Sequence, residues 1–206
     1  TAAVSLLAAQ CLAPNRDGPL LIIGAGVQGR AHLEAFAAGL GLKEVRIASR
    51  SMASAEALAA HARSLGVSAR VVHQADAELA DCPLIATCTP ASSVVLRGEP
   101  RADAFIAAVG AFTPQMVELA PELCRTLHHR GRVVLDAADA RHEAGDLLQA
   151  GLDTDGMETL DSVVACEARA KATAGTVTPV LFKNCGWAGW DLAAARLASA
   201  HRPGAA

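Results

Sequence analysis

Leu20-Leu-Ile-Ile-Gly-Ala-Gly-Val-Gln-Gly29 is the stretch of this 206-residue sequence that decides the fold. Its first four residues are apolar without alternation, which is typical of a parallel strand that is buried on both faces. The glycines that follow have the spacing G-x-G-x-x-G, and a helical pattern runs on from about Arg30 to Leu40. A strand, this glycine spacing and a helix in direct succession predict a site for the pyrophosphate of a dinucleotide. A glycine-rich turn without a ligand is the weaker alternative, because all three features are in register.

The three glycines of this spacing have separate physical tasks. Gly24 permits a tight turn, Gly26 lets the backbone approach the pyrophosphate, and Gly29 lets the helix pack closely on the strand. The pyrophosphate would then contact unpaired N–H groups at the positive end of the helix dipole.

The next predicted strand, Val45–Ala48, indicates which cofactor is bound. Sites for NAD usually end this strand with an acidic residue that accepts hydrogen bonds from the ribose 2′-hydroxyl. Here Ser49, Arg50 and Ser51 follow the strand, and they can donate hydrogen bonds to a phosphate. NADP(H) is therefore favoured, and NAD(H) remains possible. The alternative is that Arg50 is a solvated residue beside a serine that caps a helix.

Further strands and helices alternate along the chain, which predicts an α/β fold of the Rossmann type with a doubly wound parallel sheet. We expect further strands at Ala69–Val72, Leu84–Thr87, Phe105–Val109, Arg132–Asp136 and Thr178–Lys183, and helices near 51–65, 75–80, 118–129 and 187–200. Residues 15–150 are predicted to form the dinucleotide-binding domain. Residues 1–14, a linking helix, and 151–206, a C-terminal return segment, are assigned to a second, incomplete domain for substrate binding and dimerisation.

The composition excludes several classes of protein. Hydrophobic residues make up 52% and charged residues 19%, which excludes a disordered chain. A net charge of −3 and 3% aromatic residues argue against nucleic acid or anionic lipid as a partner. No apolar run reaches the ~18 residues of a membrane span. The six cysteines lack C-x-x-C spacing, so we expect reduced thiols in the cytoplasm and no metal site.

An ordered set of motifs resembles the ornithine cyclodeaminase/mu-crystallin family. The motifs are Thr1-Ala-Ala-Val-Ser5, Ile23–Gly29, Val45–Arg50, Ala108-Val-Gly110, Gly145-Asp-Leu147 and Leu181-Phe-Lys-Asn-Cys-Gly186. The resemblance implies that roughly a hundred residues precede Thr1 in the whole protein. That part would supply the Lys and Arg residues that hold the substrate, and the assembly would be a homodimer.

The resemblance also implies positions for each part of the cofactor. Gly26, Val27 and Gln28 would bind the pyrophosphate, and Ser49, Arg50 and Ser51 the adenosine phosphate. Around the other half, Thr89 and Pro90 would flank the ribose, while Val109, Gly110, Asn184 and Cys185 would approach the nicotinamide. No catalytic residue is assigned, because the proton donor is expected from the preceding part of the chain.

One departure from the family pattern bears on the reaction. The catalytic Asp of the family's cyclodeaminases falls on Phe112, and a phenyl ring cannot relay a proton. The resemblance therefore favours an NADPH-dependent oxidoreductase that reduces a cyclic ketimine acid, Δ1-pyrroline-2-carboxylate or Δ1-piperideine-2-carboxylate, to L-proline or L-pipecolate. Two alternatives stay open: a cyclodeaminase or amino-acid dehydrogenase on the same scaffold, and a redox-inactive NADP(H)-binding protein.

Overall fold

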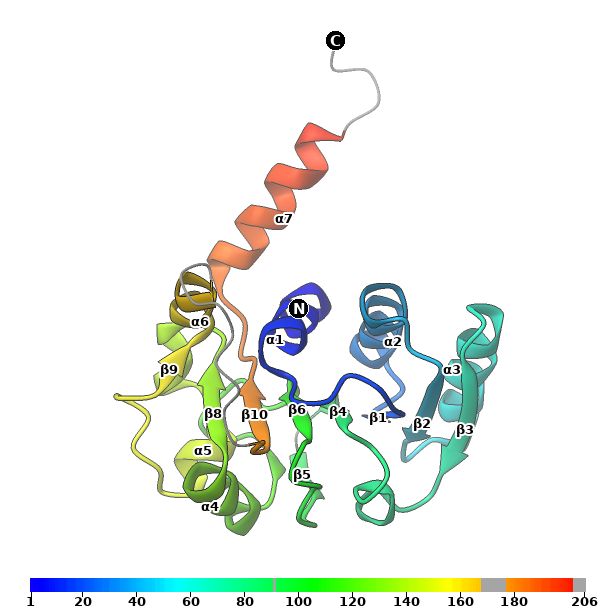
Figure 1. The fold of residues 1–206 in the computed structure, drawn as a ribbon, viewed down its shortest axis with the longest axis horizontal. Coiled ribbons are helices and arrows are strands. Elements are labelled where there is room, and N and C mark those ends of the chain that lie inside the picture. Colours follow the sequence, from blue (N-terminus) through cyan, green and yellow to red (C-terminus); the bar gives the residue numbers. More distant parts are fainter. Residues whose placement is uncertain (91, 168–176, 202–206) are drawn as a thin grey trace.

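The computed structural model describes residues 1–90, 92–167 and 177–201, which form a large parallel sheet with helices on both faces (Figure 1). The strands of this sheet are β1 (Leu20–Ile23), β2 (Glu44–Ala48), β3 (Ser68–Val72), β4 (Leu84–Thr87), β6 (Phe105–Ala108), β8 (Arg132–Leu135), β9 (Glu158–Thr159) and β10 (Val180–Lys183). Within the described residues their order is β3-β2-β1-β4-β6-β10-β8-β9, and every neighbouring pair is parallel. A separate parallel pair joins β5 (Ser92–Leu96) to β7 (Val117–Leu119).

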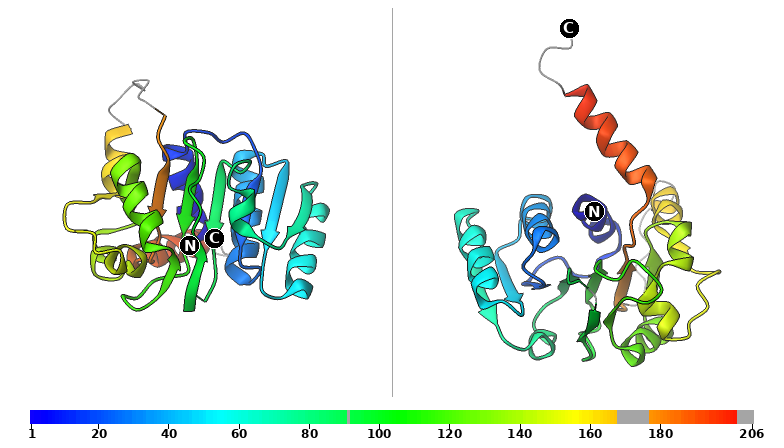
Figure 2. Two further views of the ribbon diagram at one scale, coloured as in Figure 1. Left: turned by 90° about the horizontal axis from the view of Figure 1, so that it is seen from below. Right: turned by 180° about the vertical axis from the view of Figure 1, so that it is seen from behind.

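Helices cover both faces of the large sheet, as Figures 1 and 2 show. One face packs against α1 (Ala2–Leu12), α2 (Val27–Leu40), α3 (Met52–Ser64) and α6 (Leu160–Glu167). The other face packs against η1 (Ala75–Glu78), α4 (Pro121–Arg130), η2 (Ala138–His142), α5 (Gly145–Gln149) and the β5–β7 pair. The last helix, α7 (Ala188–Ala200), extends away from the sheet and has no buried residue.

Strand β1 explains why the opening apolar run has no alternation. Leu20 and Ile22 belong to the hydrophobic core on one face of the sheet, and Leu21 and Ile23 belong to the core on the other face. Since side chains of a strand alternate between faces, a strand covered on both sides needs an apolar residue at every position. The predicted doubly wound parallel sheet is confirmed.

Strand β10 comes from the return segment 151–206, yet it lies in the middle of the large sheet. Lys183 is in register with Ala108 of β6 on one side and with Leu135 of β8 on the other. All four residues of β10 are buried, so the strand has to be covered on both faces like its neighbours. The sheet thus extends beyond residues 15–150, and the assignment of the remaining segments to a second domain stays a prediction.

The helix predicted over 118–129 begins later than the sequence indicates. Val117–Leu119 is the strand β7, and α4 starts at Pro121. Proline is favoured in the first helical turn because its missing N–H would have no partner there. Glu118 is fully buried and hydrogen-bonded to the ends of other strands, so it cannot belong to an exposed helix surface.

A buried polar network centred on His32 joins α1, α2 and the residue after β10. His32 Nδ1 lies 2.7 Å from the carbonyl oxygen of Gln28, which can only accept, so Nδ1 carries the proton. The Ser5 hydroxyl therefore donates to Nε2 at 2.9 Å, and the Asn184 amide donates to Ser5 at 3.0 Å. Burial lowers the pKa of His32 to about 4, which keeps the ring neutral in the folded protein.

This pKa predicts acid-sensitive stability. The unfolded chain has an ordinary histidine pKa near 6.5 and binds the proton more readily than the folded protein between pH 6.5 and 4. The free energy of unfolding should therefore fall by about 3 kcal/mol through His32 as the pH drops through this window. Urea unfolding at pH 4–8 measures it. In His32→Asn, which retains a donor but does not titrate, the free energy of unfolding should fall less steeply as the pH drops. Equal pH dependence of the free energy of unfolding in the variant and in wild type would contradict the prediction.

Candidate functional site

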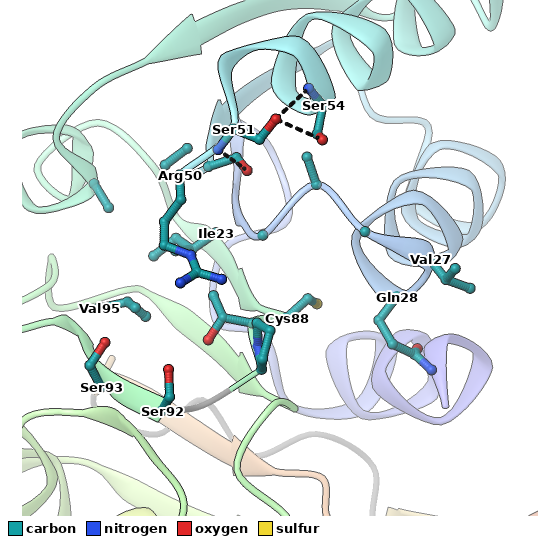
Figure 3. Close-up of a pocket in the computed structure, with 18 of the residues that line it drawn as sticks. Ile23, Val27, Gln28, Arg50, Ser51, Ser54, Cys88, Ser92, Ser93 and Val95 are labelled. Carbon is teal, nitrogen blue, oxygen red and sulfur yellow. Dashed lines mark hydrogen bonds between the residues drawn. The ribbon is translucent and has the colours of Figure 1, made fainter.

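A pocket of about 660 Å³ lies at the carboxyl ends of β1, β2 and β4 (Figure 3). It is lined by the glycine-rich turn after β1, by the residues that follow β2, β3 and β4, and by β5. In doubly wound sheets, ligands bind in the crevice at this edge, where the strand order reverses. Here the reversal falls between β1 and β4, so the pocket occupies the expected place.

The glycine-rich turn brings α2, β1 and the end of β4 together. Gly24 has a φ of +110°, and a Cβ atom there would collide with the carbonyl oxygen of Cys88. A Cβ atom on Gly29 would collide with the carbonyl oxygen of Gly24, so the helix can pack this closely only with glycine at that position. At Gly26 a Cβ atom would meet nothing within 4 Å, which leaves room for a ligand beside the backbone.

The beginning of α2 fits an anionic group. Val27 is the first residue of the helix, and Gly26 before it has no side chain that could cap the first N–H groups. Unpaired N–H groups and the helix dipole together favour a phosphate at this position. Val27 and Gln28 are exposed and line the pocket with Gly24 and Gly26, whereas Gly29 packs beneath the turn.

The predicted phosphate residues after β2 also line the pocket. Among the described residues, the Arg50 guanidinium forms no ion pair or hydrogen bond, and Figure 3 shows the side chain extending into the pocket. Ser51 caps α3 and accepts hydrogen bonds from the amide and the hydroxyl of Ser54. Ser49 accepts from the amide of Ser51 at 3.3 Å. The hydroxyl protons of both predicted serines therefore remain available to a ligand.

Several lining residues were missed in the sequence. His73 follows β3, and Ser92, Ser93 and Val95 come from β5. A polar residue directly after a strand could have pointed to His73. No local pattern predicted β5, so its serines had no signal. None of the described residues that line the pocket is acidic, which suits a ligand that carries several negative charges.

Thr89 and Pro90, the two residues expected to flank the ribose, line the pocket. A carboxylate that the sequence did not indicate accepts hydrogen bonds from Thr89. Glu118 of β7 accepts hydrogen bonds from the amide and the hydroxyl of Thr89, each at 2.7 Å. It also accepts from the hydroxyl of Thr87 and the amide of Gly110 at 2.7 Å. This carboxylate links the carboxyl ends of β4 and β6.

The other four predicted residues lie at the ends of β6 and β10 and do not line the pocket. Val109 and Gly110 are buried, and Asn184 is bound to Ser5. The Sγ atom of Cys185 lies 3.9 Å from the carbonyl oxygen of Ala111. Burial raises the pKa of the Cys185 thiol to about 12, so it stays protonated and unsuited to nucleophilic attack. A cofactor role for these residues stays a prediction.

A buried ion pair lies beside these strand ends. Lys183 Nζ and Asp146 Oδ2 are 2.8 Å apart, and both side chains are fully buried. The other oxygen of Asp146 accepts from the amides of Glu118 and Leu119. In the described part of the chain, no group of three His, Cys, Asp or Glu residues could hold a metal ion. Nor does that part contain a helix of the length and apolarity that crossing a membrane requires.

Comparison with known proteins identifies the family. The model of the "ornithine cyclodeaminase/mu-crystallin family" matches residues 1–201. The Δ(1)-pyrroline-2-carboxylate reductase 1 of Burkholderia multivorans is 35% identical over 200 residues, 96% of this chain and 60% of that protein. The ketimine reductase mu-crystallin of Mus musculus is 35% identical over 199 residues, 96% of this chain and 59% of that protein. The chain thus spans about three fifths of the length of these relatives.

A solved structure agrees with this comparison. The Δ(1)-pyrroline-2-carboxylate reductase of Thermococcus litoralis, in complex with NADH and L-proline, is 25% identical and superimposes with a TM-score of 0.81. The match covers 95% of this chain and 63% of that one. With a family model that matches nearly every residue and relatives above 30% identity, this chain belongs to the ornithine cyclodeaminase/mu-crystallin family.

Proposed function

We propose that this protein is an NADP(H)-dependent oxidoreductase that reduces a cyclic ketimine acid to the corresponding cyclic amino acid. The substrates would be Δ1-pyrroline-2-carboxylate, Δ1-piperideine-2-carboxylate or both, and the products L-proline and L-pipecolate. The observation that carries the cofactor assignment is the pocket at the end of β2, where Arg50 has no partner among the described residues and none of the described lining residues is acidic. The reductases among the relatives support the reaction.

The residues of the pocket would hold the cofactor in two parts. The beginning of α2, with Gly26 exposed beside it, would bind the pyrophosphate. Arg50, with the hydroxyls of Ser49 and Ser51, would bind the phosphate on the adenosine ribose. An arginine fork suits this task because it presents several donors in a plane to the phosphate oxygens.

The ends of β4 and β6 would orient the nicotinamide half of the cofactor. When bound, the nicotinamide would supply a hydride to the C=N carbon of the substrate, and the substrate nitrogen would carry or take up a proton. Thr89 and Gly110 are fixed by Glu118, so this side of the site is rigid before anything binds. A rigid site favours the reaction because the two reacting carbons must be held close together and aligned. The Cys185 thiol would contribute packing only.

Phe112 favours imine reduction over cyclisation of an amino acid with loss of ammonia. It lies in the loop after β6, and the residue is 51% exposed. A phenyl group has no proton to transfer, whereas the resemblance implies a catalytic Asp at this position in the family's cyclodeaminases. An apolar surface there suits the methylene groups of a cyclic imino acid.

The reaction is tested by following NADPH absorbance with each ketimine, generated enzymatically in the assay. We expect one molecule of proline or pipecolate to form for each molecule of NADPH oxidised, because one hydride reduces one C=N bond. Ammonia release from ornithine would instead indicate a cyclodeaminase. Tight NADPH binding without turnover of either ketimine or of 2-oxo acids would indicate a binding protein.

The cofactor assignment predicts a selective effect of Arg50→Ala. NADPH affinity should fall about 10- to 150-fold because a charged hydrogen-bonded contact with the phosphate is lost. NADH affinity should hardly change, since NADH lacks that phosphate. Titration of cofactor fluorescence measures both, and the loss should shrink at high salt. Arg196→Ala, which removes an exposed arginine of α7, is the matched control and should affect neither cofactor. Equal losses for both cofactors in Arg50→Ala would refute the assignment.

A further inference from the structure

Glu118 has an unusual environment for an acidic residue. Its side chain is fully buried, and four donors surround its two oxygens at 2.7 Å. Each oxygen accepts one backbone N–H, from Thr89 or from Gly110, and one threonine hydroxyl, from Thr89 or from Thr87. A backbone N–H can only donate, so this cradle is built for a carboxylate.

The negative charge of Glu118 has no cationic partner among the described residues. The hydrogen bonds that begin at the Glu118 amide lead through Asp146 to the cation of Lys183. The Nζ atom of Lys183, however, is bound to Asp146 and to the carbonyl oxygen of Ala108. That ion pair is neutral as a whole. A buried charge without a counter-ion is expensive, and its field is weakly screened. The four hydrogen bonds stabilise the charge of Glu118 but do not neutralise it, so its field acts on a positive charge that a ligand brings to the strand ends.

The position of Glu118 indicates which part of a ligand that is. In a doubly wound sheet each half of the strands holds one mononucleotide. Arg50 follows β2, so the adenosine half lies over β1, β2 and β3, and the nicotinamide half falls over β4, β6 and β10. Glu118 lies at the carboxyl ends of β4 and β6, on the nicotinamide side. The oxidised nicotinamide ring is a cation and the reduced ring is neutral.

We propose that Glu118 is a positioning residue that fixes Thr89 and Gly110 and whose charge stabilises the oxidised cofactor relative to the reduced one. This inference rests on the proposed function. Preferential binding of the oxidised form makes the bound reduced cofactor a stronger hydride donor, which suits an enzyme that reduces an imine. Because the field of a buried carboxylate is weakly screened, we expect this charge to change the ratio of the two affinities about tenfold.

The test compares the dissociation constants of NADP⁺, by calorimetry, and NADPH, by fluorescence, in Glu118→Gln and in wild type. Glu118→Gln should lower the affinity for NADP⁺ relative to NADPH about tenfold. The matched control is Thr87→Val, which removes one hydrogen bond to the same carboxylate and retains the charge. It should lower the melting temperature and leave the ratio unchanged. A purely structural role of Glu118 would change both affinities together, and an unchanged ratio in Glu118→Gln overturns the inference.

Two further outcomes have separate meanings. The Gln amide would place an N–H₂ group against one of the two backbone donors in either orientation, so the variant can fail to fold. In that case the wild type decides: NADP⁺ affinity equal to or above that of NADPH supports the inference, and any wild-type preference for NADPH overturns it. Wild type that binds neither NADP(H) nor NAD(H) refutes the proposed function itself.

Discussion

The carbonyl oxygen of Gly24 occupies the space that a side chain on Gly29 would need, and the rest of the site depends on this contact. The contact between Gly24 and Gly29 places the first turn of α2 directly against the end of β1. Gly24 in turn lies against the carbonyl of Cys88, so the end of β4 is drawn to the same point. Three elements thus converge around an uncapped helix N-terminus, and the pocket opens beside it.

Buried charged residues near the strand ends impose a second constraint, on the relative positions of the strands. Lys183 of β10 pairs with Asp146 of α5, and Asp146 accepts from the backbone of β7. That fixes Glu118, whose carboxylate then binds the ends of β4 and β6. Buried ion pairs seldom add much stability because both ions lose their hydration. Here their effect is geometric, since they connect β10 to β4 across the centre of the sheet.

The two ends of the site use charge in opposite ways. Arg50 is exposed and unbonded among the described residues, so its cation is available to a phosphate that arrives from solvent. Glu118 is buried and bound on all sides, so its anion acts only through its field and through the groups that it holds. A phosphate needs direct donors, whereas a delocalised cationic ring responds to a fixed negative charge at a distance. His32, on α2, is neutral and is linked to Asn184 of the return segment through hydrogen bonds to Ser5, and protonation of its ring at low pH would disrupt this link.

The sequence by itself determined the parallel sheet, the glycine turn and the place of Arg50, because each is a pattern of neighbouring residues. An apolar strand, a glycine spacing and a helix follow one another directly, and the residue after the second strand necessarily lies at the same edge. Only the tertiary structure decided that β10 enters the sheet between β6 and β8 and that Glu118 joins β4 to β6. Both depend on pairing between segments far apart in the chain, which local periodicity does not encode.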